Sequence, residues 1–570
     1  MKKIIVSLSV IAAFLLAVLM VLILTEGQQP VTVTPTGGVQ VPSQGGVVIQ
    51  ATTTEPVVTT TVAPTLPPFE PGKTSLSDPA NWNFTWEVLV DKEQVESYTR
   101  EEPIFFESGD YFALPGIASF RGGNYRTDAS YGTADITQKT ISKVYKGEVG
   151  YLSDPEWIGC GWTGQPLVVQ WDAETRSIMN LYDEKKEKDG LVELIYAKMD
   201  GRIHFYDMED GSQTRKPVKL GMVFKGSGAL DPRGYPLMYV GAGLAQGSKL
   251  QRLFVVSLID GSILYEYCGR DNTAYRKWSA FDSSPLVDAE TDTLIWPCEN
   301  GQLYTFKLNT VYDKEAGTIS VTPDAPVKSR YKDDYFEQDR YLGYEGSVTA
   351  VENYLYIGDN AGMFQCIDIN TMELVWAQDI VDDVNATAAF EWTDDGRGYL
   401  YVGPSKDYSN GGKKKGDLPI CKIDAQTGEI IWQHIVNCGT YDGCAGGTMG
   451  SPLLGRKGTT LEGIVVFAMA RTPGAWDSVI YALDTETGEV IWEYETKDYT
   501  WSSPVGIYGK DGTGYLFQVD NEGRCYLMDG ATGQVLNTFE LNAHIEASPV
   551  VFGNLVAIGT RHSFYILKVE

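Results

Sequence analysis

The sequence predicts an all-β protein, an eight-bladed propeller of four-stranded antiparallel blades, and three observations support this prediction. A pattern that is clearest as YALDTETGEVIW at 481–492 recurs along the second half of the chain. Glycine (60 residues) and aromatic residues (33 Tyr, 20 Phe and 13 Trp) are abundant, as short strands joined by tight turns require. Gly- or Ser-rich apolar strands also recur along the chain, and neighbouring copies of such a unit bury each other's faces.

The repeated pattern also sets the strand order within each unit. Weaker copies end at Trp376 and Trp432, and a third copy at 526–537 lacks the tryptophan. After the opening strand, two middle strands meet at a polar turn such as Asp200-Gly201, because Asp-Gly and Asn-Gly accept the positive φ values of a tight hairpin. The eight units open at the following residues: Gly164, Gly226, Asp282, Gly346, Asn385, Met449, Ser502 and Ala547.

The last unit lacks one strand, because only NLVAIG and SFYILKVE follow its opening strand before Glu570. The segment ISKVYKGEV at 141–149 is predicted to supply the missing strand. Pairing strands from both ends of the chain closes the ring and removes two free sheet edges. Seven blades are the alternative, since insertions in the third and fifth units blur the count.

Residues 1–25 are interpreted as a cytoplasmic lysine pair followed by a transmembrane signal anchor. Lys2 and Lys3 precede an apolar run from Ile4 to Leu24 that only Ser7 and Ser9 interrupt. The run is long enough to cross a bilayer as one helix, whereas a secretory core usually has about 7 to 15 residues. The two lysines predict that their end stays cytoplasmic. We therefore expect a single-pass protein of the cell membrane with its propeller on the extracytoplasmic side; a cleaved signal is the alternative.

Two segments separate the anchor from the repeats at 136–570. Residues 26–75 are rich in Thr, Pro, Val and Gly, as in TTTEPVVTTTVAPTLPPFEPG, which predicts a disordered linker without a packed core. Residues 76–135 form a prelude packed on the propeller. Its segments NWNFTWEVLV and EEPIFFESGDYFAL are predicted to be strands of a small cap or of an extra pair on the main body.

The formal net charge of −29, from 75 acidic and 46 basic residues, argues against nucleic acid or an anionic lipid surface as a partner. Solubility is the simpler reason for such a charge. The run Lys413-Lys414-Lys415 lies in a Gly-rich insert and is interpreted as a solvated loop.

A consensus A-x-D-x-x-T-G-x-x-x-W is present in the clearest copy as Ala482, Asp484, Thr487, Gly488 and Trp492. It resembles the repeat of the PQQ-like (pyrroloquinoline-quinone) β-propeller family. The resemblance covers roughly 120–570, and the segment FRGGNYR at 120–126 is similar to the motif that precedes the first blade in that family. The family contains quinoprotein dehydrogenases and a noncatalytic, BamB-like branch, and the chain resembles the second more than the first.

The motif residues are interpreted as structural joints of the blades. Asp484 and Thr487 are expected to bond the backbone of the turn, Gly488 to supply a left-handed conformation and Trp492 to pack between sheets. The same roles are assigned to their counterparts in two other copies: Asp424, Thr427, Gly428, Trp432 and Trp376.

For the dehydrogenase branch, the resemblance implies two adjacent cysteines against the quinone, a calcium site and an aspartate base. The sequence has no Cys-Cys dipeptide, and its nearest pair, Cys438 and Cys444, is the one predicted disulfide. The four histidines show no metal-ligand spacing, so no metal site is predicted. No cofactor is expected, PQQ is disfavoured despite the family name, and Ca²⁺ is left open. A quinone- or calcium-dependent oxidoreductase of the quinoprotein type remains the alternative function.

The residues that open the blades are expected to line the central channel. Aligned two before the small residue of each opening, they are Thr163, Gly226, Asp282, Glu345, Asn385, Met449, Trp501 and Glu546. Carboxylates and an amide that converge at one mouth would suit a hydrated cation or a polar ligand, and plain water-filled lining is the other interpretation. Trp162 and Trp278 near the same rim would stack a sugar or an aromatic side chain.

The predicted ligand-binding residues are therefore Asp282, Glu345, Asn385, Trp501 and Glu546. No catalytic residue is predicted. The favoured function is a membrane-tethered extracytoplasmic binding or scaffold module for a protein, peptide or cell-wall ligand. Neither the identity of the ligand nor the oligomeric state follows from the sequence.

Overall fold

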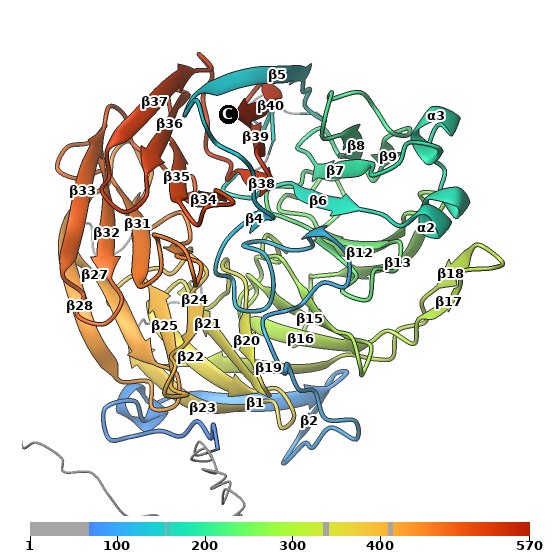
Figure 1. The fold of residues 1–570 in the computed structure, drawn as a ribbon. Coiled ribbons are helices and arrows are strands. Elements are labelled where there is room, and N and C mark those ends of the chain that lie inside the picture. The colour runs from blue at the N-terminus through green and yellow to red at the C-terminus, as the bar shows by residue number, and fades with distance from the viewer. Residues whose placement is uncertain (1–67, 154–156, 161, 334–340, 408–413) are drawn as a thin grey trace, which may run out of the picture. The chain divides into compact units, whose positions relative to one another are not determined.

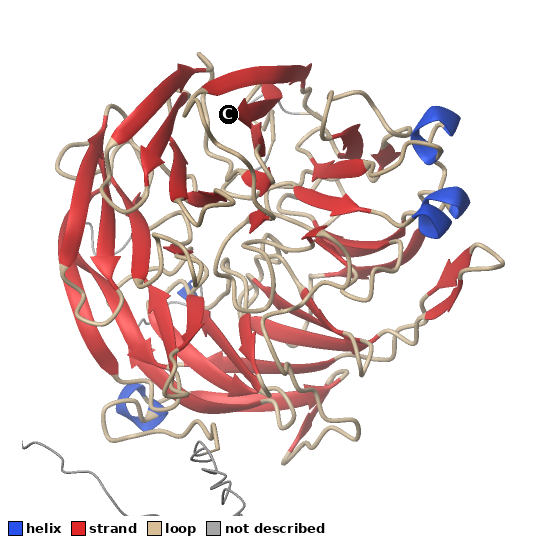
Figure 2. Ribbon diagram, in the orientation of Figure 1, coloured by secondary structure: helices blue, strands red, loops and turns tan. Residues whose placement is uncertain are grey.

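Eight β-sheets are arranged radially in the computed structural model, which describes residues 68–153, 157–160, 162–333, 341–407 and 414–570 (Figure 1). The all-β, eight-bladed prediction is confirmed. The helices η1 (Pro79–Trp82), α2 (Ala173–Ile178) and α3 (Asp183–Lys186) lie at the periphery (Figure 2). Each predicted opening segment leads into the first strand of a blade.

Blades are numbered by the chain order of their first strands. Blade 1 contains β6 (Leu167–Gln170), β7 (Val192–Ala197), β8 (Arg202–Asp207) and β9 (Val218–Lys219). Blade 2 contains β10 (Ala229–Leu230), β11 (Leu237–Gly241), β12 (Arg252–Ser257) and β13 (Ile263–Cys268). Blade 3 contains β14 (Leu286–Asp288), β15 (Thr293–Cys298), β16 (Gln302–Lys307) and β19 (Val327–Lys332), and it carries a ribbon of β17 (Val311–Asp313) and β18 (Thr318–Ser320). Blade 4 contains β20 (Thr349–Val351), β21 (Tyr354–Gly358), β22 (Met363–Asp368) and β23 (Glu373–Asp379).

The remaining blades complete the ring. Blade 5 contains β24 (Ala389–Trp392), β25 (Gly398–Val402), β27 (Lys415–Asp424) and β28 (Ile430–Gly439). Blade 6 contains β30 (Leu453–Leu454), β31 (Ile464–Ala470), β32 (Ser478–Asp484) and β33 (Val490–Thr496), extended by β29 (Gly446–Gly447) and β26 (Ser405–Lys406). Blade 7 contains β34 (Val505–Tyr508), β35 (Gly514–Val519), β36 (Arg524–Asp529) and β37 (Val535–Glu540). Blade 8 contains β38 (Val550–Phe552), β39 (Leu555–Gly559), β40 (Ser563–Val569) and β5 (Ile141–Glu148).

Blade 8 is closed by strands from both ends of the repeat region, as predicted. β5 pairs antiparallel with β40, from Ile141 opposite Val569 to Glu148 opposite Ser563. In Figure 1, the β5 arrow runs beside the C-terminal strand at the outer edge of this blade. The pairing covers the edge of β40 and joins the two ends of the ring.

The repeated motif forms a joint between consecutive blades. Asp484 Oδ1 accepts hydrogen bonds from the backbone N–H groups of Glu486 (3.0 Å) and Thr487 (2.8 Å), which fixes the turn between β32 and β33. Gly488 has a φ of +73°, and a Cβ there would lie 2.6 Å from the Trp432 ring of the preceding blade. Glycine therefore allows both the left-handed turn and the close approach of the indole.

Each motif tryptophan also donates to the turn of the following blade. Trp376 Nε1 donates to the carbonyl oxygen of Ala425 (3.2 Å), Trp432 Nε1 to that of Thr485 (3.1 Å), and Trp492 Nε1 to Gly530 (2.9 Å). In the two other joints, a Cβ at the turn glycine would lie 2.7 Å from Trp376 or 2.6 Å from Trp492; these glycines are Gly428 and Gly533. Each tryptophan thus packs against the turn glycine of the following blade. A larger residue at that turn would clash with the indole, which explains why the two residue types recur along the chain.

Residues 118–131, termed the axial segment, contact the inner strands of blades on opposite sides of the ring. Arg121 is fully buried, and its guanidinium donates to the carbonyl oxygens of Pro452 (2.8 Å) and Pro504 (2.7 Å) in blades 6 and 7. Gly122 has a φ of +94°, and a Cβ there would lie 2.5 Å from the carbonyl oxygen of Asp128. This glycine is therefore required by the backbone.

Two further residues of the axial segment bind blade 4. Asn124 Nδ2 donates to the carbonyl oxygen of Ala350 (2.9 Å), and Arg126 Nε donates to that of Val348 (2.9 Å). Burial lowers the pKa of both Arg121 and Arg126 to about 10. The residues that resemble the family motif before the first blade thus form a buried hub for the inner strands.

The first half of the prelude runs along the outside of the ring; residues 68–107 are termed the N-terminal strap. β1 (Thr85–Val90) pairs with the outer strand β19 of blade 3, and β2 (Glu93–Val95) pairs with β1. NWNFTWEVLV therefore contributes an extra strand, as predicted.

The second predicted strand of the prelude is wrong in part. EEPIFFESGDYFAL contributes only an isolated bridge between Phe106 and Glu352, next to the end of β20, and otherwise forms no strand. Further along, β3 (Gly116–Ile117) adds to blade 1 and β4 (Ser130–Tyr131) to blade 8.

No helix among the described residues is long and apolar enough to span a bilayer. The predicted anchor at 1–25 and most of the predicted linker at 26–75 lie outside those residues.

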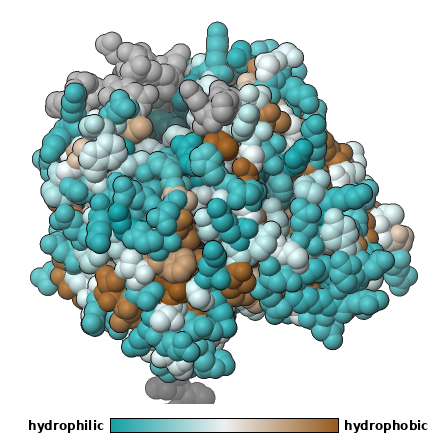
Figure 3. Space-filling view, turned by 90° about the horizontal axis from the view of Figure 1, so that it is seen from above, coloured by the Kyte–Doolittle hydropathy of each residue, from teal (hydrophilic) through white to brown (hydrophobic). Residues whose placement is uncertain are grey.

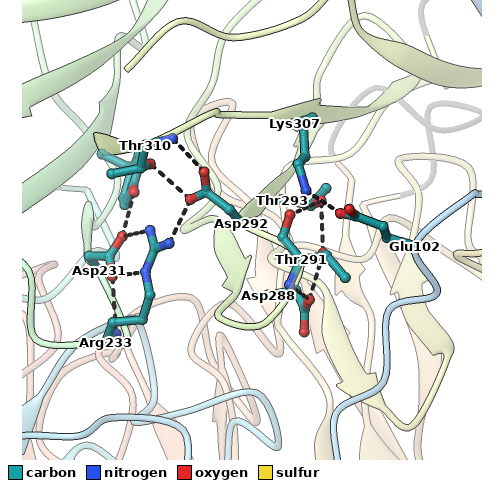
Figure 4. A network of polar contacts seen from close by, with 10 residues as sticks. Glu102, Asp231, Arg233, Asp288, Thr291, Asp292, Thr293, Lys307 and Thr310 are labelled. Atoms are coloured by element: carbon teal, nitrogen blue, oxygen red, sulfur yellow. Dashed lines mark hydrogen bonds and ion pairs between the residues drawn. The ribbon is translucent and has the colours of Figure 1, made fainter. Parts of the chain in front are cut away.

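Charged side chains join the N-terminal strap, blade 2 and blade 3 in the region shown in Figure 4. Arg233 donates to both carboxylate oxygens of Asp231 (2.8 and 2.6 Å) and pairs with Asp292 (2.7 Å). Lys307 of β16 pairs with Glu102 of the strap. Seen from the side of β5 and β37, the surface is mostly hydrophilic, with small apolar patches (Figure 3).

Candidate ligand site at the channel mouth

The predicted channel residues line two connected spaces. A narrow cavity of about 40 Å³ is lined by six of the eight predicted positions, which are Thr163, Gly226, Asp282, Glu345, Asn385 and Met449. Phe120 of the axial segment lines the same cavity. A wider cavity of about 550 Å³, termed the mouth, shares Glu345, Asn385 and Met449 with it and adds Trp501. Opening positions of the blades therefore do meet at the channel.

Glu546, by contrast, lines neither cavity. Its carboxylate is buried and pairs with Arg561 at 2.8 Å, while His544 Nε2 lies 3.2 Å from it. Trp278 also lies apart from the mouth and is 41% exposed. Of the predicted ligand-binding residues, Asp282, Glu345, Asn385 and Trp501 are the ones that the structure brings to the channel.

A polar network runs along one side of the mouth. Arg276 donates to Asn360 Oδ1 (2.8 Å), which turns the Asn360 amide toward two carboxylates. Asn360 Nδ2 donates to Glu345 Oε1 and to Asp383 Oδ1, at 3.1 Å each. Asn385 Nδ2 donates to the other oxygen of Asp383 (2.7 Å). These bonds fix the two carboxylates beside each other at the rim.

Buried carboxylates give the channel a surplus of acidic groups. Burial raises the pKa of Asp383 well above its usual range, and the nearby Glu345 carboxylate adds to this shift. Burial likewise raises the pKa of Glu299, again with a contribution from Glu345. Burial alone would lower the pKa of Lys225, but the surrounding carboxylates, Asp282 foremost, raise it overall. Lys225 forms an ion pair with Asp282 at the channel wall.

Aromatic rings also line the mouth. Trp162 and Trp501 both line it, with ring centroids 5.5 Å apart, and Trp157 lies 5.7 Å from Trp162. Trp501 is buried against Tyr499, and its Nε1 donates to the carbonyl oxygen of Ala445 (3.2 Å). The Trp501 indole is therefore held in place before any ligand arrives.

Sequence reasoning missed a second ring of residues at the mouth. Arg276, Asn360, Asp383 and Asp407 line it but do not open a blade. Asn360 stands just after the second strand of blade 4, and Glu299 stands just after the second strand of blade 3. Because the second strand returns to the face from which the first one starts, aligning the repeats at this position would have found both residues.

The cysteines are free thiols in the structure, so it does not contain the predicted bridge between Cys438 and Cys444. Cys438 is buried at the end of β28, and Cys444 lines the mouth. Over the described part of the chain, no group of three or more His, Cys, Asp or Glu side chains is arranged to hold a metal ion.

Part of the repeat region matches the model of a known protein family. A family model described as outer membrane protein assembly factor BamB matches residues 476–565, which span blades 6 to 8 and include the motif that ends at Trp492. Over these residues the chain matches the PQQ-like β-propeller family. This confirms the resemblance expected from the sequence.

Two solved quinohemoprotein alcohol dehydrogenases share the fold at low sequence identity. Quinohemoprotein alcohol dehydrogenase ADHIIG from Pseudomonas putida HK5 has a TM-score of 0.50 and 13% identity, over 82% of each chain. Quinohemoprotein alcohol dehydrogenase from Comamonas testosteroni has a TM-score of 0.50 and 12% identity, over 80% of each chain. BamB from Moraxella catarrhalis gives a TM-score of 0.45 and 16% identity, over 70% of this chain and 98% of BamB.

Curated relatives match only a short stretch. The beta-alanine-activating enzyme of Danio rerio is 29% identical over 101 residues, which is 17% of this chain and 9% of that enzyme. The human protein of the same name is 25% identical over 93 residues, 16% of this chain and 8% of its own length. The chain thus matches less than a tenth of these relatives.

The mouth does not fit the quinone and calcium group that the dehydrogenase branch of the PQQ-like family implies. Cys444 lines the mouth without an adjacent cysteine in the sequence. Asp282 is paired with Lys225, and the amide N–H donors of Asn360 and Asn385 point at the mouth carboxylates. No redox step is therefore assigned to these residues.

Proposed function

We propose that the chain is a membrane-tethered, extracytoplasmic binding module whose propeller holds part of a protein, peptide or cell-wall ligand at the channel mouth. One observation carries this proposal: a cavity of about 550 Å³ is lined by polar and aromatic side chains from several blades. Preformed concave sites of this size, apolar on one side and with a few placed polar groups, are typical of ligand binding.

The proposal predicts that filling the mouth abolishes ligand capture. Ala445 lines the mouth, so the variant Ala445→Phe places a ring in it whatever the chemistry of the ligand. Ala316→Phe, on the exposed turn of the β17–β18 ribbon, is the matched control. Crosslinking in intact cells followed by purification should recover the same partner with the original chain and with Ala316→Phe, and lose it with Ala445→Phe. Equal recovery with Ala445→Phe would refute a ligand site at the mouth.

Membrane attachment is the second part of the proposal, and the apolar run at 4–24 supports it. Protease added to intact cells should cut the linker at 26–75 and release the propeller, and the remaining stub should stay in the membrane fraction. Release of the intact chain by a salt wash would contradict a spanning anchor.

An oxidoreductase of the quinoprotein type is the second candidate, favoured by the shared fold alone. Adding PQQ and Ca²⁺ to the purified protein is expected to give no thermal shift and no dye-linked alcohol oxidation. A clear response of both readouts would overturn the noncatalytic proposal.

A further inference from the structure

Among the described residues, more acidic than basic side chains line the channel mouth. Glu345 and Asp383 line the mouth, and Arg276 is the basic side chain that lines it among the described residues. Arg471 lies near Trp501, but its guanidinium is directed to the carbonyl oxygens of Ala445 (3.1 Å) and Ala475 (2.6 Å). The local field therefore favours a positively charged occupant.

Two carboxylate oxygens, one on Asp282 of the narrow cavity and one on Glu299 beside Arg276, have no hydrogen-bond partner among the described residues. Glu299 Oε1 and Asp282 Oδ1 are both buried, and the side chains of the two residues are 3% and 14% exposed. A buried, unpaired carboxylate oxygen is costly because it has lost its hydration without gaining a donor. Positive charge placed at the mouth would reduce this cost through its electrostatic field.

The aromatic side of the mouth is suited to an organic cation. The chain's own cations stay at the outer limit of cation–π contact: Lys225 and Arg561 lie 5.8 Å from the Trp162 ring centroid, and Arg471 lies 5.9 Å from that of Trp501. Met449 adds a flexible thioether beside these rings. A hydrated metal ion gains little from such a wall, whereas an alkyl chain packs against it.

We propose that the mouth recognises an alkylammonium group, with the ammonium between Glu345 and Asp383 and its alkyl stem against Trp162 and Trp501. This inference rests on the proposed function, because it names the chemical class of the ligand held at the same mouth. A lysine side chain of a peptide, an amino sugar and a free diamine all present this group. The amide donors of Asn360 and Asn385 already face the carboxylates, which leaves their remaining acceptor positions to the three N–H donors of an ammonium.

The test measures binding of defined probes to the full-length protein in detergent by isothermal titration calorimetry. The probes are Nα-acetyl-lysine amide, glucosamine and cadaverine, and the neutral control is Nα-acetyl-norleucine amide, which has the same alkyl chain without the charge. At least one amine should bind and the neutral analogue should not; whichever amine binds best identifies the source of the group. CaCl₂ alone is the fourth arm. Stronger binding of Ca²⁺ than of every amine, or equal binding of the neutral analogue, would overturn the proposal.

Substitutions at the mouth test where the amine binds. Glu345→Gln and Asp383→Asn keep the shape of each side chain and should weaken amine binding by about tenfold or more, since each removes a charge-assisted hydrogen bond. Glu486→Gln, at an exposed turn, is the matched control and should bind as the original chain does. Circular dichroism of every variant establishes that it is folded, and Asp407→Asn provides a third variant if one of the first two is not.

The two proposals fail in different ways. If Ala445→Phe abolishes capture of the cellular ligand but no amine binds the purified protein, the binding function stands and the alkylammonium inference falls. If Ala445→Phe captures the ligand normally while amines bind in a Glu345-dependent manner, the mouth is an amine site and the proposed function falls.

Discussion

Replacing Arg126 with methionine should destabilise the ring, because this side chain is a buried donor that joins the axial segment to blades 3 and 4. Its guanidinium is 0% exposed and donates to the carbonyl oxygens of Val348 (2.9 Å), Phe120 (2.7 Å) and Ser284 (3.1 Å), and to Ser119 Oγ (2.9 Å). Methionine has similar length and packs readily, but it donates to none of these atoms.

The magnitude follows from two opposing effects. Three buried carbonyl oxygens lose their donor, and each unsatisfied group costs about 1–3 kcal/mol. Removing a buried charge returns part of its desolvation cost: burial lowers the pKa of Arg126 from 12.5 to about 10, which corresponds to about 3 kcal/mol. The lost hydrogen bonds cost about 3–9 kcal/mol together, so the free energy of unfolding should fall by about 3 kcal/mol at the middle of this range and by at most about 6 kcal/mol.

Urea unfolding of the full-length protein in detergent, followed by tryptophan fluorescence, measures this difference. Arg252→Met is the matched control, because Arg252 on β12 pairs with Glu266 at 2.9 Å near the surface. Its loss should cost less than about 1 kcal/mol. If Arg126→Met were as stable as Arg252→Met, the axial segment would not be the hub described above.

Three further predictions concern the backbone, the buried acids and the repeat motif. Gly122→Ala should lower the melting temperature, because it forces a Cβ to 2.5 Å from a carbonyl oxygen at a φ of +94°, whereas Gly150→Ala, with nothing within 4 Å, should not; equal melting temperatures would refute the strain. Burial raises the pKa of Asp359 from 3.8 to about 8, so the folded chain holds this proton more tightly than the unfolded chain. The stability that it contributes is full below about pH 4 and lost as pH rises through about 8, so the free energy of unfolding should fall by up to about 1.4 kcal/mol per pH unit between these limits. Urea titrations at pH 5 and pH 8 measure this slope, and Asp359→Asn should flatten it; an unchanged slope in the variant would assign the pH dependence to other acids. Asp484→Ala removes the acceptor of two turn N–H groups and should cost about 1–2 kcal/mol while leaving amine binding at the mouth unchanged; a loss of binding would show that the motif does more than join blades.

Most of the fold could be predicted from the repeat pattern, because each blade is formed by residues close together in the chain. The eight openings and the closing strand at 141–149 could be located from the sequence, since strand alternation and Gly-containing turns are set by residues close together in the chain. EEPIFFESGDYFAL misled the prediction because its alternating apolar residues resemble a strand. Whether a segment pairs depends on the presence of a free sheet edge, which lies elsewhere in the chain.

The candidate site was predictable only in part, for a related reason. Asp282, Glu345 and Asn385 were placed at the channel by their common position in the repeat. Glu546 occupies the same position, yet Arg561 pairs with its carboxylate and it does not line the channel. Such pairings depend on which side chain another strand presents, and neither composition nor periodicity records that. Arg276 lines the mouth but was not predicted, because it lies in a loop between blades and has no fixed position in the repeat.

The N-terminal strap has a mechanical consequence. Before the chain reaches the closing strand β5, it is fastened to the outside of the ring: the Gly72 N–H donates to Gln426 (2.8 Å), the Ala377 N–H to Ser77 (3.0 Å), and Trp86 Nε1 to Met372 (2.7 Å). A pull along the chain from its N-terminal side is therefore taken up by blades 4 and 5 and by β1 on blade 3, as shear across many bonds. The seam between β5 and β40, whose opening would unravel the propeller, carries none of that tension until the strap has come away.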